Sequence, residues 1–391
     1  MMNVDKKNKL GIITYHAADN YGSVLQVYAL SHYLSEVFSV DCNIINYSSK
    51  SQRRMYELYF ANDSIKTVLK NIYIFFVLRR RKLNKIRRFL EFRTENFKMY
   101  PANPTCDIEK LDVNRYDWIV CGSDQIWNVR VDDYNPIYML KGINGPYKLS
   151  YAASMGGVDL KLSKMESHEI YECLKEYMGI SVRENIAKKM LSECAVDNVR
   201  NDIDPTFLLS EDHWKNVMTP RVIEGEYIFF YSVDYNEESV KIAEWYGKNL
   251  NLPVIYVNTS WQSYFIKKGR MKCFKNAGIE EFLSLVYYAK AVLSGSFHGT
   301  AFSLIFNKPF YRIQRNQNNS AVVDDRIRTL FDILEIRGRE ISTENYKEKI
   351  NGLFDMEYQT INENIKIAQN KAREYFSSIL LEEVKNENRK N

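Results

Sequence analysis

One segment of the 391-residue chain combines an imidazole with small and hydroxylic side chains. Residues 294–300 read Ser-Gly-Ser-Phe-His-Gly-Thr and follow the apolar run 291–293. The pattern predicts a strand that ends in a loop, with an apolar helix starting immediately after it. Backbone N–H groups at a helix start bind anions, and an imidazole exchanges protons near neutral pH. His298 is therefore a candidate general acid/base, with a structural hydrogen bond as its alternative role.

Two further loops carry polar side chains after predicted strands. Residues 17–23 follow the apolar run 10–16 and open a helix. Residues 122–128 follow the buried strand 117–121 and hold four hydrogen-bonding side chains and an indole, a density typical of sugar sites. Loops at the carboxyl ends of strands are the usual ligand sites of open α/β sheets. Neither loop has the glycine spacing of a mononucleotide fingerprint, and each could instead be a plain turn.

The elements that position these loops alternate between strands and helices along the chain. Such alternation predicts α/β domains with mainly parallel sheets. We expect an N-terminal domain over residues 1–183, a C-terminal domain over 184–360, and a polar amphipathic helix over 361–391 that packs back on the first domain. The strand candidates are 10–16, 42–47, 117–121, 148–154, 179–182, 227–233, 254–257 and 291–293.

Three further motifs lie between the second and third loops: Tyr-Ala-Ala-Ser at 151–154, Ser-Val-Arg-Glu at 181–184 and Asp-Pro-Thr at 204–206. Taken in order along the chain, the three loops and these motifs resemble the polysaccharide pyruvyl transferase family. The resemblance extends from about residue 10 to residue 335 and rests on the ordered set of motifs. The resemblance implies an α/β fold of two Rossmann-like domains facing each other, as in GT-B glycosyltransferases. It also implies transfer of pyruvate from phosphoenolpyruvate to a sugar as a ketal.

The resemblance assigns roles to individual residues. His298 matches a position tied to catalysis, and Arg183 matches an arginine that contributes to anion binding. Phosphoenolpyruvate carries a phosphate and a carboxylate, so its site needs fixed cations, preferably arginines. We place Ser296, Gly299 and Thr300 beside Arg183 on the donor side. The expected acceptor-binding residues are Asn20, Tyr21, Gly22, Ser123, Asp124, Gln125 and Trp127. The reaction requires no metal and no cofactor, since phosphoenolpyruvate is a substrate.

One position departs from the family pattern. Many members carry an arginine two residues before the histidine, where this chain has Ser296. A second donor-binding cation must then come from elsewhere. We favour Arg315, which follows a predicted strand, and Arg326, which opens a predicted helix, although both could be solvated charges. The downstream candidates are Lys308, Arg312, Arg315, Arg326 and Arg328.

Two other functions remain open. A GT-B-type glycosyltransferase would use the same loops to bind the diphosphate of a nucleotide-sugar. A sugar-binding protein without catalytic activity would suit the departure at Ser296. Incubation with phosphoenolpyruvate and a sugar acceptor separates these functions from pyruvyl transfer.

The charge distribution bears on partners and location. The net charge is +5, yet residues 79–88 carry seven cations and no acid, which leaves the rest of the chain slightly acidic. A nucleic-acid-binding protein would spread its cations over a whole face, so we expect no nucleic-acid partner. We find neither a signal peptide nor an apolar run long enough to span a bilayer, and therefore expect a cytoplasmic protein.

The basic run directly follows the apolar residues 72–78 and is interleaved with Leu83, Ile86, Phe89 and Leu90. This spacing predicts an amphipathic helix with a basic face, which is either solvated or docked on a membrane. Surface polymers are commonly assembled on lipid-linked carriers, so the acceptor could be linked to a polyprenyl diphosphate. We expect residues 72–90 to contact anionic lipid at the inner face of the membrane.

Overall fold

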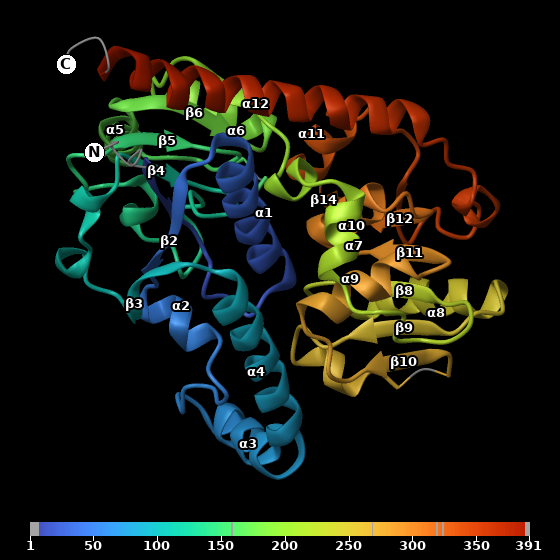
Figure 1. Cartoon of the computed structure of the whole chain (residues 1–391). Coiled ribbons are helices and arrows are strands. Elements are labelled where there is room, and N and C mark those ends of the chain that lie inside the picture. Colours follow the sequence, from blue (N-terminus) through green and yellow to red (C-terminus); the bar gives the residue numbers. More distant parts are fainter. Residues whose placement is uncertain (1–7, 158, 268, 318–319, 323, 388–391) are drawn as a thin grey trace.

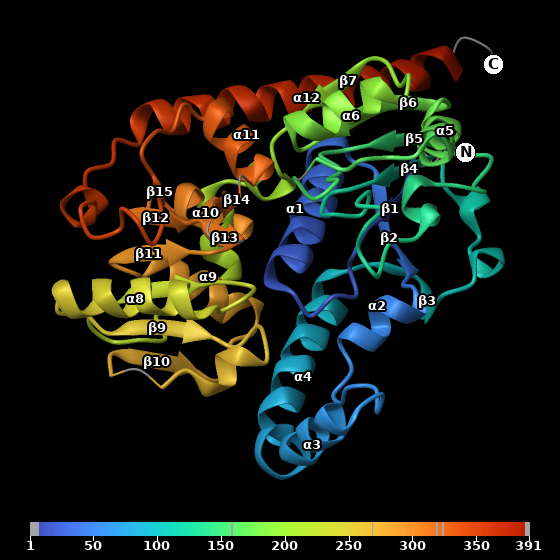
Figure 2. The same ribbon diagram turned by 180° about the vertical axis from the view of Figure 1, so that it is seen from behind.

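The structure is a computed structural model that describes residues 8–387 apart from 158, 268, 318–319 and 323. It contains two α/β domains, and a long C-terminal helix lies across both of them (Figure 1). The view from behind shows the same arrangement (Figure 2). Each domain is centred on a parallel sheet with hydrophobic clusters on both faces. Strands buried on both faces read as near-continuous apolar runs, which is why they stand out in the sequence.

The first sheet has seven strands within the described residues, in the order β3-β2-β1-β4-β5-β6-β7. β1 pairs with both β2 and β4, so the direction of winding reverses between β1 and β4. Loops that follow these two strands meet at this switch point, where open α/β sheets bind ligands. The strands are β1 (Lys9–Ile13), β2 (Asp41–Tyr47), β3 (Met99–Thr105), β4 (Trp118–Cys121), β5 (Tyr147–Ser150), β6 (Tyr177–Val182) and β7 (Val199–Asn201).

The second sheet repeats this topology, with six strands in the described part of the chain in the order β10-β9-β8-β11-β12-β15. Its switch point lies between β8 and β11. A separate antiparallel hairpin consists of β13 (Arg315–Gln317) and β14 (Ser320–Val322). The sheet strands are β8 (Ile228–Tyr231), β9 (Val254–Val257), β10 (Met271–Phe274), β11 (Ala291–Ser294), β12 (Phe310–Ile313) and β15 (Glu340–Ile341).

Helices connect these strands and cover the sheets. Those of the first domain are α1 (Tyr21–Phe38), α2 (Lys50–Met55), α3 (Ile65–Tyr73), α4 (Arg79–Asn96), α5 (Lys164–Leu174) and α6 (Asn185–Glu193). Those that follow are α7 (Glu211–Val217), α8 (Glu237–Asn249), α9 (Ile279–Tyr287), α10 (Phe297–Ile305), α11 (Asp325–Ile333) and α12 (Gln359–Glu387).

The first sheet extends beyond the boundary that we expected at residue 183. After β6, the chain forms α6 and returns as β7, which pairs with β6. A strand of three residues is too short to give a periodic pattern, so the sequence does not reveal it. The C-terminal helix begins at Gln359 and reaches the first domain, where the hydroxyl of Tyr375 donates to the carbonyl of Ser150 at 2.8 Å.

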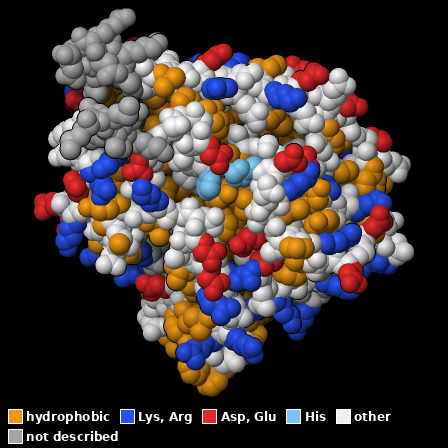
Figure 3. Space-filling model, viewed as in Figure 1, with side chains coloured by type: hydrophobic (Ala, Val, Ile, Leu, Met, Phe, Trp, Pro, Cys, Tyr) orange, Lys and Arg blue, Asp and Glu red, His pale blue; other side chains and the backbone are white. Residues whose placement is uncertain are grey.

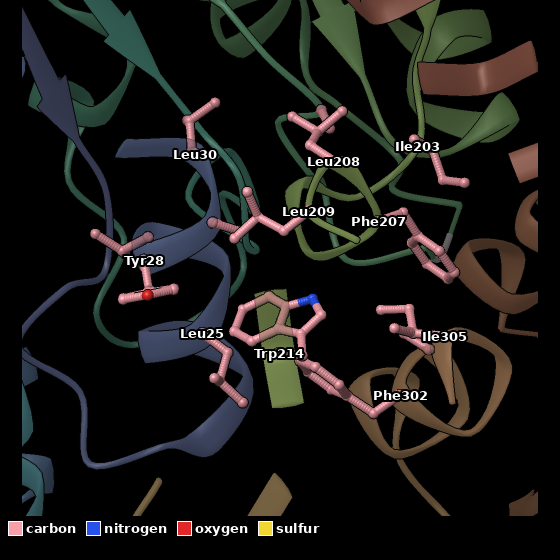
Figure 4. Packing of buried hydrophobic residues seen from close by; sticks show 14 of the residues in the cluster. Leu25, Tyr28, Leu30, Ile203, Phe207, Leu208, Leu209, Trp214, Phe302 and Ile305 are labelled. Carbon is pink, nitrogen blue, oxygen red and sulfur yellow. The ribbon is translucent and has the colours of Figure 1, made fainter. Parts of the chain in front are cut away.

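A shared hydrophobic core joins the two domains. Figure 4 shows Tyr28 of α1, Trp214 of α7 and Phe302 of α10 within it. The ring of Trp214 lies 5.5 Å from that of Tyr28 and 5.1 Å from that of Phe302, measured between centroids. The core therefore holds α1 against α10, the helices that follow the switch-point loops of the two domains.

Helices α3 and α4 form a hairpin that projects from the body of the protein (Figures 1 and 2). The basic face that we expected on α4 is divided. Three of its cations contact the second domain: Arg81 donates to the Cys273 sulfur at 2.6 Å, Lys85 donates to the carbonyl of Asn258 at 3.1 Å, and Arg88 pairs with Glu281. Arg79, Arg80 and Arg87 are exposed. Among the described helices, none has the length and apolar character needed to cross a membrane.

Candidate active site

A cavity of about 260 Å³ lies between the domains at their two switch points. Asn20, Ser23, Asp124 and Gln125 line it from the first domain. The polar residues that line it from the second domain are Ser296, His298, Arg312, Asp324 and Arg326. The cavity thus brings together the three loops that the sequence singled out.

The wall from the first domain is built by capping and short polar contacts. The Asn20 side chain caps α1 by accepting from the backbone N–H of Gly22 at 2.9 Å and of Ser23 at 3.3 Å. The Ser23 hydroxyl donates to Asp124, whose other carboxylate oxygen accepts from the Gln125 N–H at 2.8 Å. These contacts fix the carboxylate of Asp124 at the cavity surface.

Three of the expected acceptor residues lie behind this wall. Tyr21 is 1% exposed, and its hydroxyl donates to the carbonyl of Ala277 in the second domain at 2.9 Å. Trp127 is fully buried, and its indole N–H donates to the carbonyl of Tyr138 at 2.9 Å. The buried Ser123 hydroxyl donates to the carbonyl of Ala152 at 2.7 Å. These side chains hold the loops in place, and the sequence could not show this because their partners come from other elements.

His298 lies in the first turn of α10, directly against the start of α1. A Cβ atom placed on Gly22 would lie 1.9 Å from Nδ1 of His298 and 2.4 Å from Cγ. The imidazole therefore packs on the bare Cα of Gly22. Gly22, which we expected to contact the acceptor, makes room for the histidine of the other domain.

A buried carboxylate stands behind His298. Oδ2 of Asp204 lies 3.6 Å from Nε2 of His298 and accepts from Nη1 of Arg183 at 2.7 Å. Its Oδ1 accepts from the Thr206 N–H at 3.0 Å. Burial alone would raise the pKa of Asp204, but His298, Arg183 and Thr206 hold this pKa well below the usual range. Asp204 is thus ionised and lies directly beside the imidazole. Its Asp-Pro-Thr motif was the only sign of it in the sequence.

Arg183 lies behind the cavity wall and does not line the cavity. It is 3% exposed, and its guanidinium carbon lies 4.6 Å from the centre of the Phe297 ring. Its Nε and Nη2 are buried, with no hydrogen-bond partner among the described residues. In this conformation Arg183 holds Asp204, so its expected contact with the donor stays a prediction.

Two arginines bring positive charge to the cavity. Nε and Nη2 of Arg326 donate to the two carboxylate oxygens of Asp324, each at 2.8 Å. Nη2 of Arg312 lies 3.6 Å from the same carboxylate. Burial would raise the pKa of Asp324, but Arg326 and then Arg312 lower it to about 2. Asp324 also caps α11, so both guanidinium groups are anchored at a helix start.

The other candidate cations lie elsewhere. Arg328 is half-exposed and pairs with Asp325. The ammonium of Lys308 lies 5.0 Å from the centre of the Tyr287 ring. The side chain of Arg315 lies outside the described residues. Of the two cations that we favoured, Arg326 lines the cavity, and Arg312 joins it there.

Of the three small donor-side residues, one lines the cavity. Ser296 is the N-cap residue of α10 and faces it. A Cβ on Gly299 would lie 2.4 Å from the Ser294 hydroxyl, so Gly299 lets α10 pack closely on β11. The Thr300 hydroxyl is buried and donates to the carbonyl of Ser296 at 3.1 Å.

Within the described residues, no group of three or more His, Cys, Asp or Glu side chains could hold a metal ion.

We expect Gly22→Ala to lower turnover by about 10²-fold, because the new methyl group must displace the imidazole of His298 or part the domains. Steady-state kinetics with the donor and acceptor measure this loss. Gly269→Ala is the matched control, since a Cβ at Gly269 meets nothing within 4 Å. Equal activity of the two variants would show that the position of His298 tolerates an added methyl group.

Comparison with solved structures confirms the expected fold. S. aureus MnaA in its co-structure with UDP is 11% identical, with a TM-score of 0.52 over 95% of this chain and 97% of that one. A putative UDP-N-acetylglucosamine 2-epimerase from Listeria monocytogenes is 8% identical, with a TM-score of 0.51 over 96% and 97%. At these identities the likeness concerns the fold alone, two Rossmann-like domains arranged as in GT-B proteins.

Comparison of the sequence with family models and curated proteins shows the family of the chain. No curated protein matches the chain significantly. The family model described as polysaccharide pyruvyl transferase matches residues 20–317, which include His298, Asp204, Arg183 and Arg312. Because this match covers most of the chain, the protein belongs to the polysaccharide pyruvyl transferase family.

Proposed function

We propose that the protein transfers pyruvate from phosphoenolpyruvate to a sugar, forming a ketal and releasing phosphate. The acceptor would be a sugar of a cell-surface polysaccharide or of its lipid-linked precursor. One observation carries this proposal: a single interdomain cavity holds His298 backed by the Asp204 carboxylate, together with two guanidinium groups. An acid/base group beside an anion site is what transfer from an acidic enol phosphate requires.

The second domain supplies the donor site in this proposal. Phosphoenolpyruvate would place its phosphate and carboxylate between the first turn of α10 and the guanidinium groups of Arg312 and Arg326. The N–H groups of a helix start and the forked donors of arginine both suit these anions. Asp324 keeps the two guanidinium groups in place.

The first domain supplies the acceptor site. Asn20, Asp124 and Gln125 face the cavity from that side and present an amide, a carboxylate and a second amide to sugar hydroxyls. The Ser23 hydroxyl and the Gln125 N–H hold the carboxylate of Asp124 at the surface, where it would accept a hydrogen bond from a sugar hydroxyl. The two substrates thus meet at His298.

The reaction balances with these groups. A proton is added to the methylene carbon of phosphoenolpyruvate, and a sugar hydroxyl attacks the adjacent carbon. A neighbouring hydroxyl attacks the same carbon, and the bond to the phosphate oxygen breaks. The two hydroxyl protons that are lost replace the proton added to carbon and protonate the phosphate. His298 would exchange the proton, and Asp204 would stabilise its imidazolium form.

The proposal is tested by incubating the protein with phosphoenolpyruvate and sugar acceptors, free and lipid-linked. Phosphate release should require both substrates, and mass spectrometry should find pyruvate on the acceptor. Sugar transfer from a nucleotide-sugar, without phosphate release from phosphoenolpyruvate, would instead identify a glycosyltransferase. Binding of phosphoenolpyruvate without turnover on any acceptor would indicate a protein that only binds its ligands.

We expect Arg326→Lys to raise the KM for phosphoenolpyruvate by about tenfold, with a smaller effect on the KM for the acceptor. Lysine keeps the charge but loses the planar fork that grips phosphate or carboxylate. Arg328→Lys is the matched control, because Arg328 lies two residues away, half-exposed and paired with Asp325. A raised acceptor KM alone in Arg326→Lys would contradict the donor assignment.

A further inference from the structure

The end of the α3–α4 hairpin presents an apolar surface to solvent. We call residues 65–80 the hairpin tip; they comprise α3, the π-helical turn Ile74–Leu78 and the start of α4. No residue of α3 is buried. Six large apolar side chains of the tip are at least half exposed, with Ile65 at 81% and Phe76 at 77%. They are Ile65, Leu69, Ile72, Phe75, Phe76 and Val77. An exposed apolar cluster of this size marks a contact surface.

Cations surround this apolar surface. Lys66 of α3 is exposed, and so are Arg79 and Arg80 at the start of α4. No acidic residue occurs between Asp63 and Glu91 in the sequence. Figure 3 shows apolar and basic side chains gathered at the lower end of the molecule, where Figure 1 places α3. The hairpin tip is therefore both apolar and positively charged.

The base of the hairpin contacts the second domain. The Tyr73 ring packs on Phe265 and Trp261 of the second domain, with centroids 5.6 and 6.1 Å apart. Arg81 and Lys85 of α4 donate to Cys273 and Asn258 of the same domain. The side of the hairpin that faces the protein thus contacts the second domain. The outward side is left without a partner among the described residues.

We propose that the hairpin tip docks on an anionic lipid bilayer, with Phe75, Phe76 and Val77 entering the headgroup boundary. Apolar side chains at the end of a helical hairpin bury area there, and nearby arginines bind anionic headgroups. A second copy of the chain fits this surface less well. A symmetric contact between two tips would bring Arg79 and Arg80 of each copy against cations of the same sign. The docking surface lies outside the cavity and does not depend on the proposed reaction.

Docking of the hairpin tip on a bilayer would also orient the active-site cavity relative to the membrane. A second cavity, of about 300 Å³, lies at the base of the hairpin and is lined by Asp19, Lys82 and Trp261. Asp19 is the neighbour of Asn20, which lines the active-site cavity. The hairpin therefore lies between the proposed bilayer contact and the first-domain wall of the active-site cavity, where the acceptor would bind. This consequence, unlike the docking itself, rests on the proposed function.

The docking is tested by co-sedimentation of the purified full chain with vesicles of phosphatidylcholine alone or mixed with phosphatidylglycerol. We expect clear binding to the anionic vesicles and weak binding to the neutral ones. Phe76→Ser should lower the partition coefficient by about tenfold or more, because one exposed ring no longer enters the bilayer. The double variant Arg79→Gln with Arg80→Gln should lower it by about thirtyfold, and added salt should reduce this difference.

Matched controls separate docking from general surface effects. Ile367→Ser changes a half-exposed apolar residue on α12, and Lys241→Gln with Lys248→Gln removes two exposed cations from α8. These variants, and His298→Ala, should bind vesicles like the unchanged protein. The proposal is wrong if the unchanged protein binds neither vesicle or if the tip variants bind equally well. It is also wrong if Phe76→Ser converts a dimer to a monomer while vesicle binding persists. Failure of catalysis with vesicle binding intact would affect only the proposed function.

Discussion

His298→Ala is expected to lower the kcat of ketal formation by about 10²- to 10⁴-fold, while the protein stays folded. The imidazole lines the interdomain cavity, packs on Gly22 and faces the ionised Asp204. No other histidine lines this cavity within the described residues. Phosphate release from phosphoenolpyruvate in the presence of acceptor measures the loss. Far-UV circular dichroism and the Tm show whether the fold persists.

The matched control for this variant is His168→Ala, which removes an exposed imidazole from α5. It should retain full turnover. Added free imidazole should restore part of the activity of His298→Ala, because truncation leaves a space beside Asp204. Turnover of His298→Ala at the level of the unchanged protein would remove His298 from the mechanism.

The parts of the fold that could be predicted are those fixed by local patterns. β1, β4 and β11 appear in the sequence because strands buried on both faces are short apolar runs followed by polar loops. Those loops line one cavity because topology brings the carboxyl ends of switch-point strands together. β7 was not predicted, because three residues are too few to show a hydrophobic period. Without this strand, we expected the first domain to end at residue 183, before α6.

The individual roles depended on contacts that no local pattern encodes. We expected Tyr21 and Trp127 to bind the acceptor, yet both are buried and donate hydrogen bonds to the carbonyls of Ala277 and Tyr138. The sequence predicts that the basic run forms a single face of its helix, but Arg88 pairs with Glu281 in the other domain. A charged residue on a helix is equally plausible facing solvent or another domain, and only tertiary packing decides between them.

Asp204→Asn is expected to cause the largest loss of stability, about 3–5 kcal/mol of unfolding free energy at neutral pH. Asp204 is 1% exposed and accepts from Arg183, which is itself 3% exposed. An amide in its place removes the carboxylate that pairs directly with the buried Arg183 guanidinium. It also removes the negative charge 3.6 Å from His298, so turnover should fall with stability. Urea titration and kinetics below the unfolding transition measure the two effects separately.

The pH dependence of this loss identifies its electrostatic part. The pKa of Asp204 is lowered in the folded protein, so its ionised form stabilises the fold at every pH above its unfolded pKa of about 3.9. That contribution declines as the pH falls from this value toward the folded pKa. The difference in unfolding free energy between the unchanged protein and Asp204→Asn should therefore shrink below about pH 4. Asp332→Asn, which alters a solvent-exposed pair with Arg337, should cost at most about 1 kcal/mol. A loss in Asp204→Asn that did not change with acid would mean that packing or hydrogen-bond geometry, rather than the charge of Asp204, stabilises this junction between the domains.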